Sequence, residues 1–461
     1  MLKDIKKVHF IGIGGYGMSG LARVLLYLGF QVTGSDLKKS EITDKLTQQG
    51  AVINIGHDAR YLGQAELVVY STAIAGDNPE IAAAKAAGLP VWHRSELLAH
   101  FLNARFGIAI AGAHGKTTTT SMSAFVLTRG GLDPTAFIGG VLGEFDGNAR
   151  VGKSDLLVAE ADESDNSFLR YHPSIAVVTN IEPDHLEHYN NDFNLLLAAY
   201  KKFLTNIKPG GCAILFADDI HLQQIRPSHL NSIVTYSIYS PADYRATGLE
   251  KIGWGTRFSV LNQGKQLGEI TLRVPGTHNV ENALAAIAIA SQLNVPFVDI
   301  KAGLEEFSGA KRRFQFLLCE KGYTIVDDYA HHPTEVAATL DAARYGVAER
   351  VIVVFQPHRY SRTRLFMDEF ARSLAKADKI YLHKVYAASE TPLAGVDSVE
   401  LAARTRHLGA DVVQIDDASQ MVAQVVADAR PGDLIISMGA GDITEIGHAI
   451  AAGLREKINA D

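Results

Sequence analysis

A glycine-rich segment followed by a lysine and a threonine is the part of this chain best suited to bind phosphate groups. It runs directly after the apolar residues 108–111. Backbone N–H groups at a turn between a strand and a helix point into one space, where the helix dipole favours an anion. The lysine would reach the β- and γ-phosphates of a nucleotide, and the threonine hydroxyl would bind Mg²⁺. We therefore predict a nucleotide-binding loop formed by Gly112, Ala113, His114, Gly115, Lys116, Thr117 and Thr118.

This loop is shorter than the usual phosphate-loop pattern, which places four residues between its first glycine and the Gly-Lys pair. Here only Ala113 and His114 stand between the two glycines. The alternative is a chance Gly-Lys-Thr sequence in a turn. The four threonines at 117–120, together with a predicted strand before the loop and a predicted helix after it, favour phosphate binding.

Acidic residues and a histidine follow two further predicted strands in the same region. Glu160 comes directly after the predicted strand 155–159, where a carboxylate is expected to partner Mg²⁺. The alternative is a solvated acidic loop, and we expect the other acids of residues 160–165 to lie on the surface. His185 follows an acid after the predicted strand 175–179, a position that fits metal ligation or proton transfer.

A second glycine motif lies near the start of the chain. Gly12, Gly14 and Gly17 form a G-x-G-x-x-G pattern between a predicted strand at 8–11 and a predicted helix at 18–28. Asp36 stands nineteen residues after Gly17, where a dinucleotide-binding fold places its ribose-binding carboxylate. The motif alone predicts NAD, but physically it requires only a diphosphate approached closely by backbone N–H groups.

Composition limits the classes of function. The chain has 461 residues, of which 47% are hydrophobic and 21% charged, as in ordinary globular proteins. A net charge of −7 argues against a dominant nucleic-acid surface. The N-terminal segment shows no signal-peptide pattern, and no apolar run reaches membrane-spanning length, so we expect a cytoplasmic protein. Cys212 and Cys319 both stand beside apolar residues, and we expect both to be buried free thiols.

Predicted strands and helices alternate along the whole chain, which indicates an α/β fold. They fall into three segments, residues 1–105, 106–310 and 311–461. The third segment carries polar clusters at its strand ends, including residues 327–335 and 356–364.

Together these motifs resemble the Mur ligase family of peptidoglycan synthesis, over essentially the whole chain. The resemblance rests on residues 12–17, 112–120, 160–165, 180–185, 278–279, 327–333 and 355–362. It implies a Rossmann-like N-terminal domain that binds a UDP-sugar, a central P-loop ATPase-type α/β domain and a C-terminal Rossmann-like α/β domain. The C-terminal domain would bind the amino acid and close over ATP.

The resemblance also implies a reaction. The carboxylate of UDP-N-acetylmuramate would attack the γ-phosphate of ATP to give an acyl phosphate and ADP, and the amine of L-alanine would then displace phosphate. The implied cofactors are ATP and Mg²⁺. The implied partners are these two substrates, with no nucleic acid and no membrane, in a monomer or a homodimer.

Site residues are assigned by the same resemblance. The catalytic set would be Lys116, Glu160, His185, His331, Arg359 and Arg362. Mg²⁺ would be held by Thr117 and Glu160, and a second Mg²⁺ by His185. Asn279 and Asn282 would face the adenine of ATP, and His278 would also belong to the ATP site. The UDP-sugar and substrate contacts would be Gly12, Gly14, Gly15, Gly17, Met18, Asp36, Ser71, Thr72 and His332.

Several alternatives stay open at this point. Asparagines at a helix start often only cap the helix. Arg359 and Arg362 would share one face if their turn is helical, or else they form a solvated basic loop with Arg364. Competing functions are a recycling ligase that joins a whole peptide to the same UDP-sugar, and an NAD-binding regulatory protein. A folylpolyglutamate-type ligase is disfavoured by the N-terminal glycine motif.

Overall fold

The structure is a computed structural model that describes residues 4–145, 147–226, 232–345, 348–388 and 390–460. The first three residues of the N-terminal segment lie outside this description. The chain forms two compact units. One comprises residues 1–247, 259–270 and 281–306, and the other comprises residues 248–258, 271–280 and 307–461. Within the described ranges, no helix combines the length and the apolar character needed to cross a membrane.

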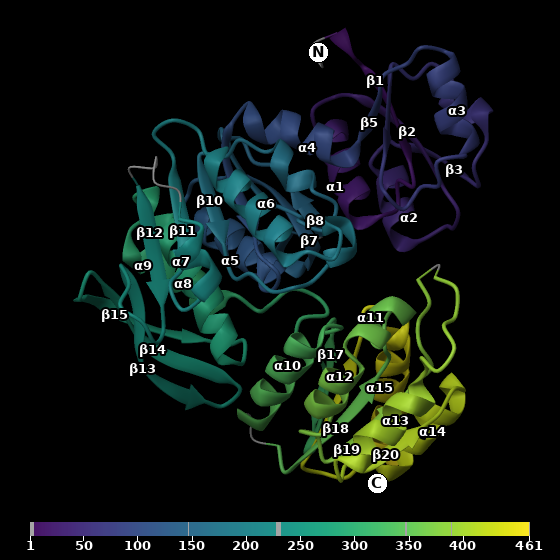
Figure 1. Cartoon of the computed structure of the whole chain (residues 1–461), viewed down its shortest axis with the longest axis vertical. Helices are drawn as coiled ribbons and strands as arrows, with labels where there is room; N and C mark the ends of the chain where they lie inside the picture. The colour runs from purple at the N-terminus through teal and green to yellow at the C-terminus, as the bar shows by residue number, and fades with distance from the viewer. Residues whose placement is uncertain (1–3, 146, 227–231, 346–347, 389, 461) are drawn as a thin grey trace. The chain divides into compact units, whose positions relative to one another are not determined.

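The chain begins with a five-stranded parallel sheet of order β3-β2-β1-β4-β5. Its strands are β1 (Lys7–Ile11), β2 (Gln31–Asp36), β3 (Val52–Ile55), β4 (Leu67–Tyr70) and β5 (Val91–His93). Its helices are α1 (Tyr16–Tyr27), α2 (Glu41–Gln48), α3 (Pro79–Ala86) and α4 (Arg94–Asn103), with a 3₁₀ turn η2 (Ala59–Leu62) (Figure 1). Because the strands are parallel, the glycine motif after β1, Asp36 at the end of β2 and residues 71–72 after β4 lie at one sheet edge.

A ten-stranded sheet follows, in the order β15-β14-β13-β12-β11-β10-β6-β9-β7-β8. Its strands are β6 (Phe106–Ala111), β7 (Thr135–Leu142), β8 (Gly147–Arg150), β9 (Leu156–Glu160), β10 (Ile175–Val178), β11 (Cys212–Phe216), β12 (Ile233–Ser237), β13 (Tyr244–Ile252), β14 (Gly255–Asn262) and β15 (Lys265–Leu272). Its helices are α5 (Lys116–Arg129), α6 (Phe193–Thr205), α7 (Ile220–Gln224), α8 (Thr277–Gln292) and α9 (Phe297–Glu306), with 3₁₀ turns η3 (Gly143–Phe145), η4 (Ser167–Arg170) and η5 (Leu186–Tyr189).

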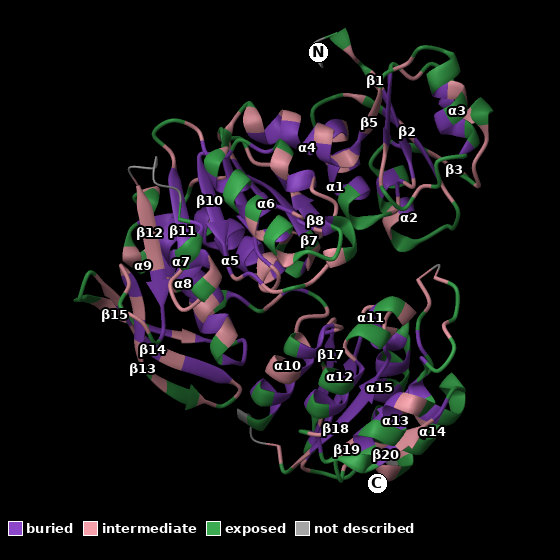
Figure 2. Ribbon diagram, in the orientation of Figure 1, coloured by how far each residue is buried: buried purple, intermediate pink, exposed green. Residues whose placement is uncertain are grey.

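The centre of this sheet is buried on both faces. Residues 108–111 of β6 are fully buried, which explains why the strand is an unbroken apolar run and does not alternate. Its neighbours β10 and β9 run parallel to it, so the three strands end at the same edge. Helix α5 is buried almost all round, and Figure 2 shows the buried residues concentrated on the strands and on the sheet-facing sides of the helices.

The second unit contains a six-stranded sheet of order β16-β17-β21-β18-β19-β20. Its strands are β16 (Gln315–Glu320), β17 (Tyr323–Asp328), β18 (Arg350–Phe355), β19 (Lys379–Leu382), β20 (Val412–Gln414) and β21 (Asp433–Met438). Its helices are α10 (Pro333–Tyr345), α11 (Tyr360–Leu365), α12 (Met367–Leu374), α13 (Ser398–His407), α14 (Ala418–Asp428) and α15 (Ile443–Ala460).

Alternate residues of β18 enter different cores, as expected for a strand covered on both faces. Val351 and Val353 pack with α10, α12 and α13, whereas Ile352 and Val354 pack with α14 and α15. Among the strand pairs of this sheet that the structure describes, β16 and β17 are antiparallel, at the sheet edge, and the other pairs are parallel.

One sequence expectation needs correction. Cys212 is buried as predicted, but Cys319 is exposed, because it lies on the edge strand β16. Strands β7, β8, β13, β16 and β20 were not predicted. Two glycines interrupt the apolar sequence of β7, and β8 and β13 contain several polar residues, so pairing with neighbouring strands determines their conformation more than local propensity does.

Candidate active site

The predicted phosphate loop is a tight turn at the end of β6, and it needs its glycines. Gly112 and Gly115 have φ angles of 134° and 82°, which disfavour any residue with a side chain. A Cβ atom on Gly112 would lie 2.0 Å from Thr179 Oγ1, and one on Gly115 would lie 2.5 Å from Asn282 Oδ1. Neighbouring side chains therefore pack directly against the loop backbone, which continues into the N-terminus of α5.

Residues at the end of β10 fix the loop from the side. Ala113 N donates to Asn180 O at 3.0 Å, and His114 N donates to Asn180 Oδ1 at 2.8 Å. Thr179 Oγ1 donates to His114 O at 2.6 Å. Thr179 and Asn180 were not predicted as site residues. The available signal was that both follow a buried strand that could pair beside β6.

Lys116 lies among carboxylates. Its Nζ donates to carbonyl groups of its own loop and to Glu163 Oε1 at 3.0 Å. Burial lowers the pKa of Lys116, but Glu163, Asp162 and Glu160 together raise it above its usual value, so the lysine is charged. Burial raises the pKa of Glu163, which Lys116 only partly opposes.

The expectation that the other acids of residues 160–165 lie on the surface is therefore wrong in part. Glu163 is 2% exposed, and Asp162 is partly buried in an ion pair with Arg94. A count of acidic residues could not show that a lysine and an arginine would pack against them.

Thr117 and Glu160 come together as predicted. The Thr117 hydroxyl lies 3.0 Å from Glu160 Oε2 and 3.2 Å from Oε1, and Gly139 N donates to Oε2 at 2.9 Å. A hydroxyl and a carboxylate are hard oxygen donors of the kind that Mg²⁺ prefers. This pair, beside a glycine cradle and a charged lysine, fits a magnesium–nucleotide complex.

His185 follows β10, at the edge where the loop lies. It adopts a left-handed conformation with φ of 56°, immediately before η5. Its ring lies 3.5 Å from Asp184 and 3.8 Å from Glu187. The neighbouring ring of His185 lowers the pKa of Glu187 to about 2. His185 thus lies beside two carboxylates, and its ring and these carboxylates could bind one cation together.

In the N-terminal glycine motif, the structure gives Asp36 a local role. Gly14 N donates to Asp36 Oδ2 at 2.8 Å, and Gly12 N donates to Ser35 O at 2.8 Å. Asp36 thus holds the glycine loop itself. Met18 is 2% exposed, so its side chain belongs to the core, whereas Thr72 is exposed at the same sheet edge.

A buried polar cluster supports the end of β2 below this motif. Glu80 is fully buried and bonds with His9 Nε2 at 2.6 Å, His57 Nδ1 at 2.7 Å and Ser35 Oγ at 2.8 Å. Burial alone raises the pKa of Glu80, but its bonds with His9, Ser35 and His57 outweigh burial and hold the pKa below its usual value.

Helix α8 carries three residues predicted to bind ATP, two of them at the adenine. Asn282 Oδ1 accepts from Thr119 Oγ1 at 3.0 Å, and so supports α5 behind the phosphate loop. Asn279 Nδ2 donates to Pro275 O at 2.6 Å, and therefore bonds to a carbonyl before the helix. Burial lowers the pKa of His278 to about 4.

Two of the histidines predicted in the C-terminal region lie in the loop between β17 and α10. His331 Nδ1 lies 3.0 Å from Tyr329 O, and its ring lies edge-on to that of His358. Burial lowers the pKa of His331 to about 3 and that of His358 to about 4. The ring of His332 is buried against Phe366.

The predicted arginines do not share one helical face. Arg359 precedes α11 with φ of 70°, whereas Arg362 lies within α11 and is only 8% exposed. Arg364 is exposed. A solvated basic loop of three arginines is therefore the wrong description, because one of the three is buried.

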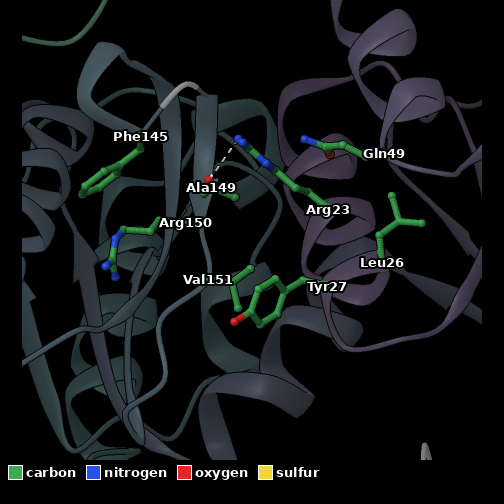
Figure 3. A pocket seen from close by; sticks show the side chains of 8 residues that line it. All are labelled: Arg23, Leu26, Tyr27, Gln49, Phe145, Ala149, Arg150 and Val151. Atoms are coloured by element: carbon green, nitrogen blue, oxygen red, sulfur yellow. Dashed lines mark hydrogen bonds between the residues drawn. The ribbon is translucent and has the colours of Figure 1, made fainter.

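A separate hollow of about 420 Å³ lies between α1 and the β7–β8 hairpin (Figure 3). In it, Arg23 Nη1 donates to Ala149 O at 3.3 Å. Its lining consists of Arg23, Leu26, Tyr27, Gln49, Phe145, Ala149, Arg150 and Val151. None of the predicted site residues lines this hollow.

Comparison with known families covers most of the chain. Residues 7–106 match the Mur ligase family, catalytic domain. Residues 110–290 match the Mur ligase middle domain, and residues 312–441 match the Mur ligase, glutamate ligase domain.

Individual relatives agree with this. The UDP-N-acetylmuramate–L-alanine ligase of Geotalea uraniireducens is 46% identical over 456 residues, covering 99% of both chains. The enzyme of that name from Myxococcus xanthus is 45% identical over 97% of this chain and 95% of its own.

Among solved structures, UDP-N-acetylmuramate–alanine ligase from Thermotoga maritima has a TM-score of 0.84 at 30% identity, covering 98% of this chain and 99% of its own. A murein peptide ligase from Psychrobacter arcticus has a TM-score of 0.73 at 26% identity, covering 97% and 98%. The predicted three-domain α/β architecture is confirmed, and the chain belongs to the Mur ligase family.

Proposed function

We propose that this chain is an ATP-dependent ligase that joins L-alanine to UDP-N-acetylmuramate, forming UDP-N-acetylmuramoyl-L-alanine, ADP and phosphate in peptidoglycan synthesis. The observation that carries the proposal is the full-length similarity, at 45–46% identity, to curated ligases of that name. The phosphate loop supports the proposal chemically, because Lys116 and the Thr117–Glu160 pair are suited to bind a magnesium–nucleotide complex.

We assign the UDP-sugar to residues 1–105, ATP to residues 106–310 and the amino acid to residues 311–461. The three sheets and the three family matches support these limits. The glycine motif, with Gly12, Gly14, Gly15 and Gly17, would hold the UDP diphosphate at the N-terminus of α1. Ser71 and Thr72 follow β4 at the same edge.

In the first chemical step, the substrate carboxylate attacks the γ-phosphate of ATP and ADP leaves. Phosphoryl transfer depends mainly on positioning and on neutralising charge. The amides of residues 115–118, at the N-terminus of α5, would hold the phosphates, because those of Ala113 and His114 donate to Asn180. Lys116, which is charged, would neutralise the β- and γ-phosphates. The fixed backbone of Gly112 and Gly115 means that the loop needs little reorganisation at the moment of reaction.

We place Mg²⁺ at Thr117 and Glu160, and a second Mg²⁺ at His185. When bound, magnesium neutralises phosphate charge and so favours attack by an anionic carboxylate. Glu160 is preoriented by Gly139 N and by the Thr117 hydroxyl.

In the second step, the amine of L-alanine attacks the acyl phosphate and phosphate leaves. We assign His331, His332, Arg359 and Arg362 to binding of the incoming substrate or of phosphate. With a pKa of about 3, His331 is neutral at physiological pH. It is therefore suited to orient a substrate by hydrogen bonding, and it is too weak a base to take a proton from an ammonium group.

We propose a cytoplasmic location, where ATP is available, and a monomer or a homodimer. Light scattering at several protein concentrations would distinguish the two oligomeric states. A larger assembly would overturn this part of the proposal.

The proposal is tested by phosphate release from MgATP with UDP-N-acetylmuramate and a panel of acceptors. The panel holds L-alanine, glycine, L-serine, D-glutamate and an L-Ala-γ-D-Glu-diaminopimelate tripeptide. Release that requires both the UDP-sugar and L-alanine is expected. Release with the tripeptide alone would instead assign the chain to peptide recycling, and NAD binding without any release would overturn ligase activity.

A further inference from the structure

One arginine lies between the glycine motif and the acidic segment of the phosphate-loop region. Arg94 is the first residue of α4, and its side chain is 23% exposed. Its Nη1 lies 3.2 Å from the position that a Cβ atom on Gly17 would take. Its Nη2 lies 3.3 Å from Asp162 Oδ2. The guanidinium therefore touches the last glycine of one anion-binding loop and pairs with an acid beside the other.

The acid that it pairs with belongs to the surroundings of Lys116. Glu163 bonds Lys116 directly, and Asp162 is its neighbour in the chain, so a second negative charge acts on that lysine. Asp162 is held in place by Ser164 N, which donates to Oδ1 at 3.0 Å. Arg94 thus compensates one of the negative charges that surround the lysine of the phosphate loop.

Compensation matters because Lys116 and Glu163 are largely shielded from water, and charges interact more strongly there than in bulk solvent. If Asp162 lost its arginine, its charge would act on Lys116 without compensation and would oppose an incoming phosphate. The same loss would remove a positive charge from beside the N-terminus of α1.

We propose that Arg94 serves both substrate sites: it binds the diphosphate of the sugar nucleotide at the glycine motif, and it is a positioning residue for ATP because it neutralises Asp162. This inference rests on the proposed function. It adds that a single side chain outside both glycine loops links them.

The test is a double-mutant cycle in which calorimetry measures the binding of two probes, UDP-N-acetylmuramate and the β,γ-imido analogue of ATP with Mg²⁺. Arg94→Ala should weaken both by about tenfold. Asp162→Asn alone should leave both within about threefold of the unsubstituted chain. The double variant should recover the ATP analogue to within about threefold but should still bind the UDP-sugar about tenfold more weakly.

Matched controls separate this role from a structural one. Arg170 is exposed and donates to Oγ of Ser95, the residue after Arg94 in α4, at 2.9 Å. Arg170→Ala should therefore change neither affinity. Arg94→Lys keeps the charge and should retain most of the affinity for the ATP analogue. If Arg94→Ala fails to fold by circular dichroism, Arg94→Gln takes its place in the cycle.

The two proposals fail differently. If the unsubstituted chain does not bind UDP-N-acetylmuramate, the proposed function is overturned, and this inference with it. If binding is normal, the inference alone is overturned when loss of Arg94 leaves either affinity unchanged. It is also overturned when Asp162→Asn does not restore the ATP analogue.

Discussion

Replacing Gly115 by alanine should damage the phosphate loop more than its small change in volume suggests. The residue has a φ of 82°, and an added Cβ would lie 2.5 Å from Asn282 Oδ1. That oxygen accepts the hydrogen bond from Thr119, so it cannot move without leaving a buried hydroxyl without its acceptor. The same substitution therefore changes both the loop and the helix behind it.

The expected loss in the free energy of unfolding has two contributions. A left-handed conformation costs a residue with a side chain about 1–2 kcal/mol. Loss of the buried hydrogen bond between Thr119 and Asn282 adds about 1–3 kcal/mol. Gly131→Ala provides the reference, because Gly131 has a φ of 78° and open space where its Cβ would lie. We expect Gly115→Ala to destabilise the chain by about 1–3 kcal/mol more than Gly131→Ala does.

Urea unfolding followed by circular dichroism measures the two free energies of unfolding, and calorimetry measures binding of the magnesium complex of the ATP analogue. Gly115→Ala should bind the analogue at least about tenfold more weakly, whereas Gly131→Ala should bind it normally. Equal stabilities together with unchanged binding in both variants would refute the argument that the loop requires a glycine here.

Three further outcomes follow from the structure. Thr117→Val removes the hydroxyl beside Glu160 and should raise the Mg²⁺ concentration that gives half-maximal activity about tenfold. The control Thr128→Val, at the far end of α5, should leave this concentration unchanged. The pKa of Glu80 is depressed in the folded chain, so its charge stabilises the fold above pH 4.5 and this stability is lost as pH falls below that value. Glu80→Gln should flatten that decline in the free energy of unfolding. A thiol reagent should label the exposed Cys319 in the native chain but reach Cys212, whose pKa is raised by burial, only after unfolding.

Local patterns predicted the phosphate loop because its chemistry is continuous in the sequence. A buried strand, two glycines, a lysine and a threonine occupy neighbouring positions, and β6 and α5 form around them as expected. Glu160 was predicted for a similar reason, since it ends a buried strand. In the structure it lies beside Thr117 because β9 pairs with β6.

Contacts between segments distant in the sequence could not be predicted in this way. In the sequence, Glu163 and Asp162 are indistinguishable from surface acids. In the structure they form ion pairs with Lys116 and Arg94, respectively. The periodicity of the chain likewise did not show that Arg359 precedes α11 with a positive φ angle while Arg362 is buried within the helix. In each case the burial or conformation of the residue depends on contacts that exist only in the folded chain.

The activation of a carboxylate at the phosphate-loop site, for attack by an amine, leaves an isotopic signature. With UDP-N-acetylmuramate carrying ¹⁸O in both carboxylate oxygens, together with MgATP and L-alanine, we expect one ¹⁸O atom in the released phosphate for each amide bond formed, as measured by mass spectrometry. Unlabelled phosphate, released without formation of the amide, would show instead that ATP is simply hydrolysed and that no acyl phosphate forms.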